Sequence, residues 1–223
     1  MSRKFIIGDI HGCYKTLVAL VEEEIKLCET DTLYFLGDYI GKGPDSKNVV
    51  KYILSKKKSG YQIRCLMGNH EKMLIDSMKS DKLHYKWLWN GGSECLRSFD
   101  VYRAKEIKKK YLKFFAELEY FIELDDFILV HGGLNFNIEN PLLDKNSMLW
   151  SRNINIDKRK IGGKRLIVGH TPVKFKKIKR SLDEDIIKLD GGCVYSKIKE
   201  KQGNLVALEI EEMKLYRKYN IDM

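Results

Sequence analysis

Six short apolar runs along the chain each end in a glycine or in a polar residue. They cover residues 5–7, 33–36, 63–67, 127–130, 166–168 and 186–189. Short apolar runs that are bounded by glycine are typical of strands buried in a sheet. We therefore expect six buried strands, each followed by a loop that carries polar side chains.

Between the early runs, apolar residues recur with the period of a helix. One such pattern covers residues 14–25, and a second covers residues 49–54, with Ser46 as the expected N-cap. Strands that alternate with helices predict parallel pairing and right-handed crossovers. In sheets of this kind the loops after the carboxyl ends of the strands meet at one edge, where ligands bind.

Residues 72–118 have a different, helical character. We expect helices at 72–79, 83–89, 92–99 and 104–118, and the last has Ile107, Tyr111, Phe114, Phe115 and Leu118 on one face. This segment is predicted to be a helical insertion, or cap, within a single domain that spans residues 1–223. Residues 134–163 have no clear period, whereas 205–210 and 213–219 predict a hairpin near the C-terminus.

Composition indicates a folded protein. Hydrophobic residues make up 43% of the chain, which excludes disorder. No apolar run is long enough to span a membrane, and the N-terminal run is too short for a signal peptide, so we expect a cytoplasmic protein. The 5 cysteines show no CxxC spacing, which predicts separate free thiols, with Cys193 buried. The net charge of +10 suits an anionic partner, although the basic runs are scattered and are interpreted as solvated faces.

Polar residues that can bind metal ions follow five of the six predicted strands. They are Asp9, His11, Asp38, Asn69, His70, His131 and His170. Of the 5 histidines only His84 lies elsewhere, and we expect it on the surface of a helix. Carboxylate, amide and imidazole together suit Mn, Fe or Zn, and six ligands suit two ions about 3.5–4 Å apart with a bridging carboxylate.

The motifs resemble the metallophosphoesterase signature, in the order in which that family has them. They read GDIHG at 8–12, GDY at 37–39, GNHE at 68–71, HGG at 131–133 and GH at 169–170. The resemblance is strongest to the phosphoprotein phosphatase group of serine/threonine phosphatases in its compact bacterial form. The bacterial symmetrical diadenosine tetraphosphatases are a sister resemblance. Both imply an α/β fold, a four-layer α/β/β/α sandwich with a small helical insertion.

The resemblance also implies a role for each residue. It assigns Asp9 and His11 to the first ion, Asp38 as the bridge, and Asn69, His131 and His170 to the second ion. Mn²⁺ is the expected metal, with Fe or Zn as alternatives. His70 would protonate the leaving oxygen, and Glu71 would support the loop. Arg152, in the segment 150–152, would hold the substrate phosphate.

Two residues depart from the family pattern GDxxDRG. Gly41 stands where an aspartate usually orients the catalytic histidine, and Lys42 stands where an arginine usually contacts phosphate. Lysine offers a point charge without the planar fork of arginine, so we expect a looser phosphate grip from Lys42. Without the aspartate, the pKa of His70 would be lower and His70 would be less reliably protonated as a general acid, unless another carboxylate such as Glu71 replaces it.

Three functions remain open from the sequence. The motifs favour hydrolysis of phosphate monoesters by a serine/threonine protein phosphatase. Gly41 favours hydrolysis of a dinucleoside polyphosphate such as diadenosine tetraphosphate, because an anhydride leaving group needs less protonation. A non-catalytic module that binds phosphorylated ligands is the third. The expected partner is a phosphoprotein or a nucleotide, without membrane or nucleic acid, and the sequence does not predict an oligomeric state.

Two tryptophans bear on this choice. Trp87 and Trp89 could stack on an adenine, but aromatic residues in a helical segment more often belong to the core.

Overall fold

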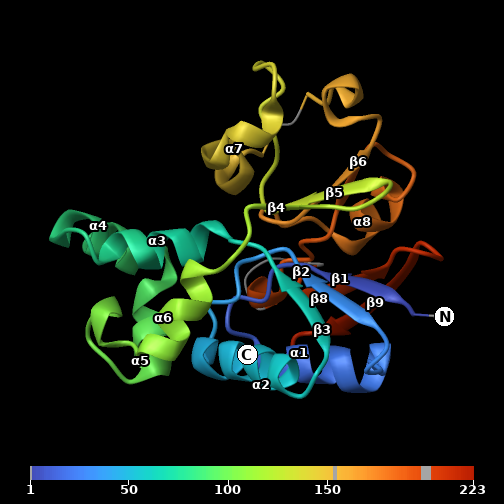
Figure 1. The fold of residues 1–223 in the computed structure, drawn as a ribbon. Coiled ribbons are helices and arrows are strands. Elements are labelled where there is room, and N and C mark those ends of the chain that lie inside the picture. Colours follow the sequence, from blue (N-terminus) through green and yellow to red (C-terminus); the bar gives the residue numbers. More distant parts are fainter. Residues whose placement is uncertain (1, 153–154, 197–201) are drawn as a thin grey trace.

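Two β-sheets form the centre of the molecule (Figure 1). The computed structural model describes residues 2–152, 155–196 and 202–223. The 5-stranded sheet has the order β3-β2-β1-β8-β9, and the 4-stranded sheet has the order β4-β5-β6-β7. The first contains β1 (Lys4–Ile7), β2 (Thr32–Phe35), β3 (Gln62–Cys65), β8 (Asn204–Glu209) and β9 (Lys214–Tyr219). The second contains β4 (Phe121–Glu123), β5 (Phe127–Val130), β6 (Arg165–Val168) and β7 (Ile186–Lys188).

All six predicted strands are present, and they pair in two parallel groups. Strands β1, β2 and β3 are parallel in the first sheet, and β5, β6 and β7 are parallel in the second. Antiparallel strands complete both sheets, because β8 pairs with β1 and β4 pairs with β5. The predicted C-terminal hairpin is confirmed as β8 and β9. Strand β4 was not predicted.

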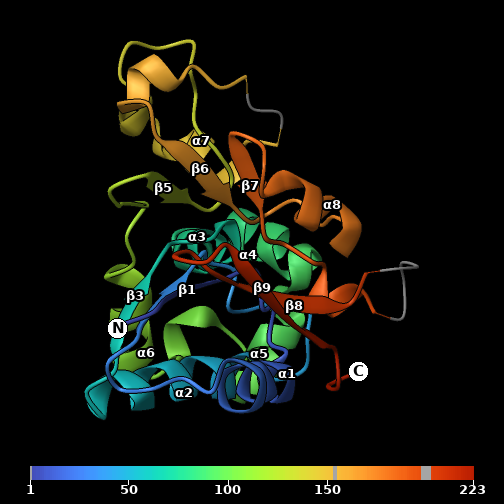
Figure 2. The same cartoon turned by 90° about the vertical axis from the view of Figure 1, so that its right-hand side faces the viewer.

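The alternation of side chains along the strands divides the core into layers. Phe5 and Ile7 pack toward the helices on the outer face of the first sheet, whereas Ile6 belongs to the cluster between the two sheets. Helices α1 (Tyr14–Ala19) and α2 (Ser46–Lys58) cover that outer face, and a π-helical segment, η1 (Leu20–Ile25), continues α1 (Figure 2).

The second sheet is covered in the same way. Its outer face packs against α7 (Lys145–Trp150) and the short helices η4 (Pro141–Leu143) and η5 (Lys158–Ile161). Helix α8 (Phe175–Ser181) contributes Ile178 to the cluster between the sheets. The result is the four-layer arrangement that the family resemblance implied.

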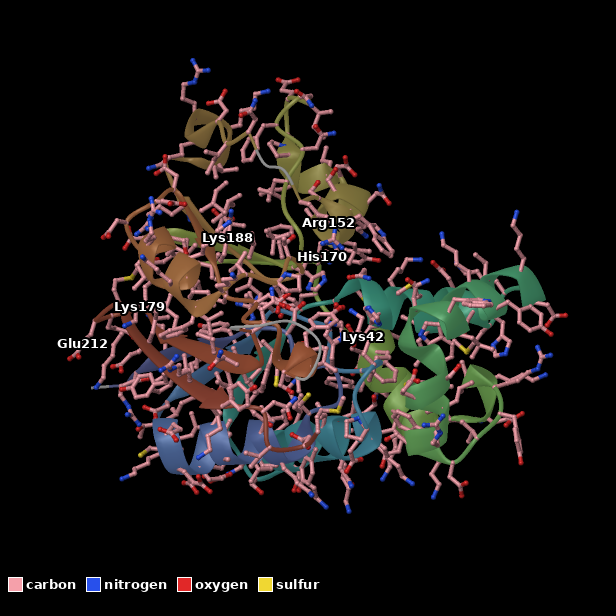
Figure 3. All side chains as sticks on the ribbon, turned by 180° about the vertical axis from the view of Figure 1, so that it is seen from behind. Lys42, Arg152, His170, Lys179, Lys188 and Glu212 are labelled. Carbon is pink, nitrogen blue, oxygen red and sulfur yellow. The ribbon has the colours of Figure 1, made fainter. Side chains whose placement is uncertain are left out.

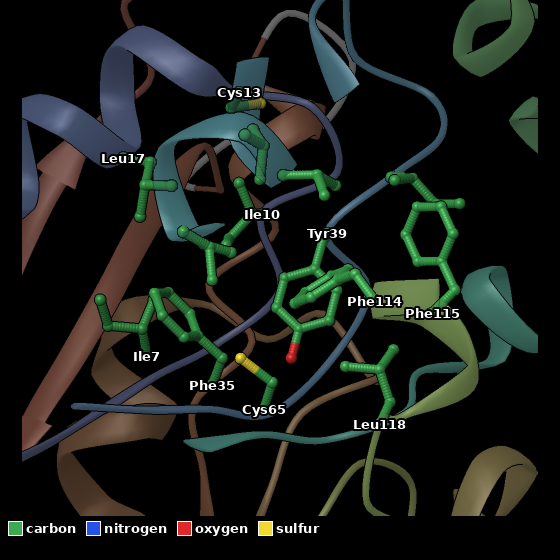
Figure 4. Packing of buried hydrophobic residues seen from close by; sticks show 14 of the residues in the cluster. Ile7, Ile10, Cys13, Leu17, Phe35, Tyr39, Cys65, Phe114, Phe115 and Leu118 are labelled. Atoms are coloured by element: carbon green, nitrogen blue, oxygen red, sulfur yellow. The ribbon is translucent and has the colours of Figure 1, made fainter. Parts of the chain in front are cut away.

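The helical segment packs beside the first sheet. It contains α3 (Asn69–Ser77), α4 (Asp81–Trp87), η2 (Leu88–Gly92), α5 (Ser93–Phe99), η3 (Ala104–Glu106) and α6 (Lys109–Ala116). Figure 4 shows Phe114, Phe115 and Leu118 beside Tyr39, and the rings of Tyr39 and Phe114 are 5.6 Å apart. This packing holds α6 against the loop that follows β2.

Several local predictions were wrong. His84 is 6% exposed and packs near Trp87, rather than on the helix surface. Trp87 is fully buried, as expected of a core residue, but Trp89 is 89% exposed. Asp45 caps α2 by accepting the Asn48 N–H, whereas Ser46 is the first helical residue and accepts the Gly41 N–H.

The cysteine prediction is confirmed. All five cysteines are free, and Cys193 is buried. Within residues 2–152, 155–196 and 202–223 there is also no helix whose length and apolar character would suit a membrane crossing.

Candidate active site

The loops that follow five parallel strands meet at one edge of the two sheets. They bring together two groups of buried side chains, one of His11, Asp38 and His70 and one of Asp38, His131 and His170. In each group the candidate ligand atoms lie within 4.8 Å of one another. Asp38 belongs to both groups, which is the position a bridging carboxylate requires. The strand ends predicted that these five side chains gather at one edge, whereas their division into two groups is seen only in the structure.

Backbone carbonyls orient two of the imidazole rings. Nδ1 of His131 lies 2.9 Å from the Leu36 carbonyl, and Nδ1 of His11 lies 3.2 Å from the Ile40 carbonyl. Each Nδ1 therefore carries the proton, and each Nε2 carries the lone pair of its ring. These Nε2 atoms face Asp38, at 3.4 Å for His131 and 3.5 Å for His11.

The donor set fits divalent metal ions. Burial lowers the pKa of both His131 and His170 to about 3, so both rings are neutral near pH 7, as a metal ligand must be. Nε2 of His170 is buried and has no hydrogen-bond partner among the described residues. Oδ1 of Asn69 lies 3.0 Å from Nε2 of His131, which adds an amide oxygen to the same edge. Imidazole, carboxylate and amide suit a borderline metal ion.

Asp9 lies outside both groups. Its buried carboxylate accepts the backbone N–H of His170, at 3.1 Å from each oxygen. Burial and the nearby carboxylate of Asp190 raise the pKa of Asp9 well above its ordinary value. Asp190 is also buried and accepts the N–H of Gly192. Neither acid has a cationic side chain at hydrogen-bond distance among the described residues, so positive charge is favourable here.

Four residues of the site have left-handed backbone conformations. The φ angles are +49° for His11, +52° for Asp38, +60° for Lys42 and +64° for His170. This conformation costs a residue with a side chain about 1–2 kcal/mol. Such strain persists only where the surrounding structure imposes it, and it gathers at functional sites.

Glu71 fixes the loop that carries Asp38. Its carboxylate accepts the backbone N–H groups of Asp38, Tyr39, Ile40 and Gly68 at 2.9–3.1 Å. Asp38 in turn accepts the backbone N–H of His70 at 3.0 Å. Glu71 therefore supports the loop, as the resemblance implied, but it does not replace the missing aspartate beside His70.

Gly41 occupies the position where the family usually has that aspartate, and it lies beside His70. A Cβ atom on Gly41 would lie 2.7 Å from Nδ1 of His70. This nitrogen is buried and has no hydrogen-bond partner among the described residues. Burial also lowers the pKa of His70 to about 4, although the Asp38 carboxylate opposes the shift. Nε2 of His70 therefore faces Asp38, whereas no described residue forms a hydrogen bond that would orient the ring through Nδ1.

Three cations surround the candidate metal centre. Nζ of Lys42 lies 3.2 Å from Nε2 of His11. Arg152 is exposed and lines a hollow of about 260 Å³ with Gly132, Gly169 and Lys188. Figure 3 shows Arg152, Lys188 and Lys42 around His170. A place for Lys188 near the site was not predicted from the sequence. Its signal was the presence of a lysine inside an otherwise apolar strand.

Comparisons with known proteins agree with this geometry. A model of the calcineurin-like phosphoesterase family matches residues 3–222. The symmetrical bis(5′-nucleosyl)-tetraphosphatase of Salmonella paratyphi A is 39% identical over 71 residues, and that of Salmonella arizonae is 41% identical over 71 residues. Each match covers 32% of this chain and 24% of the relative, so it spans about a quarter of the curated relatives' length.

Solved structures show the same fold over the whole chain. A putative diadenosine tetraphosphatase has a TM-score of 0.69 at 22% identity, covering 100% of this chain and 95% of its own. A serine/threonine phosphatase from Saccharomyces cerevisiae has a TM-score of 0.64 at 15% identity, covering 97% of this chain and 79% of its own. Similarity at these identities concerns the fold alone.

Proposed function

Because the chain belongs to the calcineurin-like phosphoesterase family, we propose that it hydrolyses the phosphoanhydride chain of dinucleoside polyphosphates. The observation that carries this proposal is the relationship between Gly41 and His70. Position 41 holds no carboxylate, and Nδ1 of His70 has no hydrogen-bond partner among the described residues. The sequence matches to tetraphosphatases support the same substrate class, more than they support a protein phosphatase.

The chemistry of the leaving group links this geometry to the substrate. A serine or threonine alkoxide leaves poorly unless an acid protonates it, and that acid must be oriented and able to hold a proton. A nucleotide leaves as a phosphate whose second pKa is about 6, so it departs without full protonation. A site in which His70 lacks an orienting carboxylate therefore suits an anhydride better than an ester.

Each residue of the site would have a separate role in the hydrolysis. Two divalent ions, both proposed to be Mn²⁺, would be held by Asp9, His11, Asp38, Asn69, His131 and His170. When bound, such ions supply Lewis acidity and activate water for attack on phosphorus. Arg152 would bind phosphate oxygens through its planar guanidinium, and Lys42 would add a second positive charge. His70 would donate a hydrogen bond to the leaving oxygen.

The test compares two substrates on the same enzyme preparation. Phosphate or nucleotide release by the Mn²⁺-loaded protein is measured as kcat/KM on diadenosine tetraphosphate and on a phosphothreonine peptide. We expect a preference of at least 100-fold for the dinucleotide, about 2.7 kcal/mol in transition-state stabilisation. A preference for the peptide would overturn the proposal and favour a protein phosphatase.

The metal assignment needs its own control. Asp38→Asn removes the carboxylate that both candidate groups share, so it should lose both Mn²⁺ binding and turnover. Asp45→Asn is the matched control, because Asp45 caps α2 and belongs to neither group. Removing metal from the wild type with a chelator should abolish turnover, and added Mn²⁺ should restore it. Full turnover by Asp38→Asn would show that the bridging assignment is wrong.

A further inference from the structure

A groove of about 500 Å³ lies beside the candidate metal centre, between the helical segment and α7. We call it the lysine groove. It is lined by Lys72, Met73, Asp76, Leu83, Lys86, Trp87, Asn90, Tyr120, Lys145, Asn146, Leu149 and Trp150. Its volume falls within the range of pockets that bind small organic ligands.

The walls of the groove belong to the elements that carry the candidate catalytic residues. Met73 is on α3, the helix that begins with Asn69 and His70. Asn90 precedes Gly91, whose carbonyl accepts the backbone N–H of Lys42 at 3.3 Å. The groove and the candidate metal centre are therefore held in a fixed relation by the same helices.

The inner end of the groove reaches the second group of candidate ligands. The ring of Trp150 lies edge-on to the ring of His170, with centroids 6.1 Å apart. Trp150 is 40% exposed, and it comes two residues before Arg152. A substrate that occupied both the metal centre and the groove would thus pass Trp150.

The chemical character of the groove is both apolar and basic. Met73, Leu149 and the two tryptophans provide apolar surface. Of its three lysines, Lys72 is paired with Asp76 and Lys145 lies over the ring of Tyr120 at 4.8 Å. Lys86 is exposed and has no ion pair within the described part of the chain. The balance of three lysines against one aspartate favours an anionic ligand.

The apolar wall of the groove also offers aromatic and sulfur surface. Trp150, Tyr120 and Met73 all line it. A heterocyclic base has a flat face that suits aromatic and sulfur contacts.

We propose that the lysine groove binds one nucleoside end of the substrate, while its phosphate chain runs past Trp150 to the metal centre. The base packs on the apolar wall, and Lys86 and Lys145 attract the phosphates nearest the nucleoside. This inference rests on the proposed function, and it makes the groove the part of the protein that distinguishes a dinucleotide from a simple phosphate ester.

Charge reversal on the two walls tests the proposal. Lys86→Glu changes α4, and Lys145→Glu changes α7, both at exposed positions. The matched control is Lys82→Glu, which lies one turn before Lys86 on α4, is also exposed and does not line the groove. For each protein, kcat/KM is measured on diadenosine tetraphosphate and on p-nitrophenyl phosphate, which has no nucleoside.

The measured quantity is kcat/KM on diadenosine tetraphosphate divided by kcat/KM on p-nitrophenyl phosphate. We expect this ratio to fall at least tenfold in Lys86→Glu and in Lys145→Glu, mainly because KM for the dinucleotide rises. Lys82→Glu should change the ratio less than twofold. An unchanged ratio in the groove variants would overturn the proposal while leaving the proposed function intact. A wild type that does not hydrolyse the dinucleotide would instead overturn the proposed function.

Binding of ADP gives a readout that does not depend on turnover. Two of the 3 tryptophans, Trp87 and Trp150, line the groove, so ADP should quench the intrinsic fluorescence of the wild type. We expect Lys86→Glu to raise the Kd for ADP at least tenfold, and Lys82→Glu to leave it unchanged. Equal Kd values in all three proteins would overturn the proposal. If the groove variants instead lost activity only on a phosphothreonine peptide, the groove would bind a peptide rather than a nucleoside, and the proposal would be overturned.

Discussion

The ammonium group of Lys42 lies 3.2 Å from Nε2 of His11, the ring nitrogen that also faces Asp38. The other nitrogen of His11 is occupied by the Ile40 carbonyl, so Nε2 carries the only free lone pair of the ring. A lone pair that accepts a hydrogen bond from Lys42 cannot bind a cation at the same time. Lys42 and a metal ion therefore compete for His11.

This competition predicts the effect of removing the charge at position 42. Lys42→Met keeps an unbranched side chain but loses the ammonium group. We expect Mn²⁺ to bind about tenfold more tightly, equivalent to about 1.4 kcal/mol, because neither the hydrogen bond nor the charge repulsion remains. Titration calorimetry with Mn²⁺ measures the change directly.

The same variant should bind substrate less well, because the positive charge that we propose to face the phosphate is lost. Lys47→Met is the control, since Lys47 is on α2 and has no ring contact or ion pair at the site among the described residues. Weaker Mn²⁺ binding by Lys42→Met would mean that the lysine helps to hold the metal centre together rather than competing with the ion.

The contact between positions 41 and 70 makes a second prediction. Gly41→Ala places a Cβ atom 2.7 Å from Nδ1 of His70 and also imposes a side chain on a φ of +85°. Gly60→Ala is a matched control, because Gly60 has a φ of +93° but nothing within 4 Å of the added atom. The control should lose about 1 kcal/mol of stability from backbone strain alone.

Thermal unfolding separates the two effects. Gly41→Ala should lose at least 1 kcal/mol more than Gly60→Ala, because His70 must move as well. The histidine signals in NMR spectra should shift only in Gly41→Ala. Equal losses of unfolding free energy in the two variants would mean that His70 can move away from the added methyl group without cost.

Much of the candidate site follows from local sequence. Each candidate ligand follows a short apolar run, and parallel strands bring their carboxyl ends together, so Asp38, His131 and His170 could be expected in one place. What could not be predicted are contacts made across long separations. Strand β8 inserts beside β1 from near the C-terminus, and no local pattern encodes that pairing.

The failures have physical causes too. His84 has a helical spacing compatible with either face, and only the tertiary packing around Trp87 buries it. Strand β4 has three residues, too few for a period to be recognised. Glu71 is the last residue of the GNHE motif, but three of its four backbone partners lie in a loop about thirty residues earlier, so its support of that loop is visible only in the fold.

The network around Glu71 makes a third prediction. Glu71→Gln replaces one acceptor oxygen with an NH₂ group that cannot accept the backbone N–H groups of the loop. We expect a loss of about 3 kcal/mol in the free energy of unfolding, together with weaker Mn²⁺ binding, because Asp38 loses its support. Glu117→Gln is the control, since Glu117 is exposed and pairs with Lys113, away from the loop. A loss of stability without any change in Mn²⁺ binding would show that the loop keeps its shape without Glu71.

An ion pair far from the site predicts how stability depends on pH. Asp31 is 2% exposed, and its carboxylate accepts hydrogen bonds from the Arg3 guanidinium at 2.6 Å and from the Cys28 N–H at 2.9 Å. Burial opposes the charge, but these hydrogen bonds outweigh it and hold the pKa of Asp31 below its ordinary value. The charged form therefore stabilises the fold above about pH 4, and the stabilisation is lost as the pH falls through the lowered pKa.

Asp31→Asn should accordingly lower the free energy of unfolding at pH 7 by about 2 kcal/mol, since it removes a charged partner of Arg3. The difference from the wild type should shrink as the pH falls below about 4, because the wild-type carboxyl is then progressively protonated as well. Urea unfolding at pH 7 and pH 3 measures both differences. Asp125→Asn is the control, because Asp125 is exposed and should show no difference at either pH. A difference for Asp31→Asn that stayed constant across this range would mean that the side chain contributes through its shape rather than through its charge.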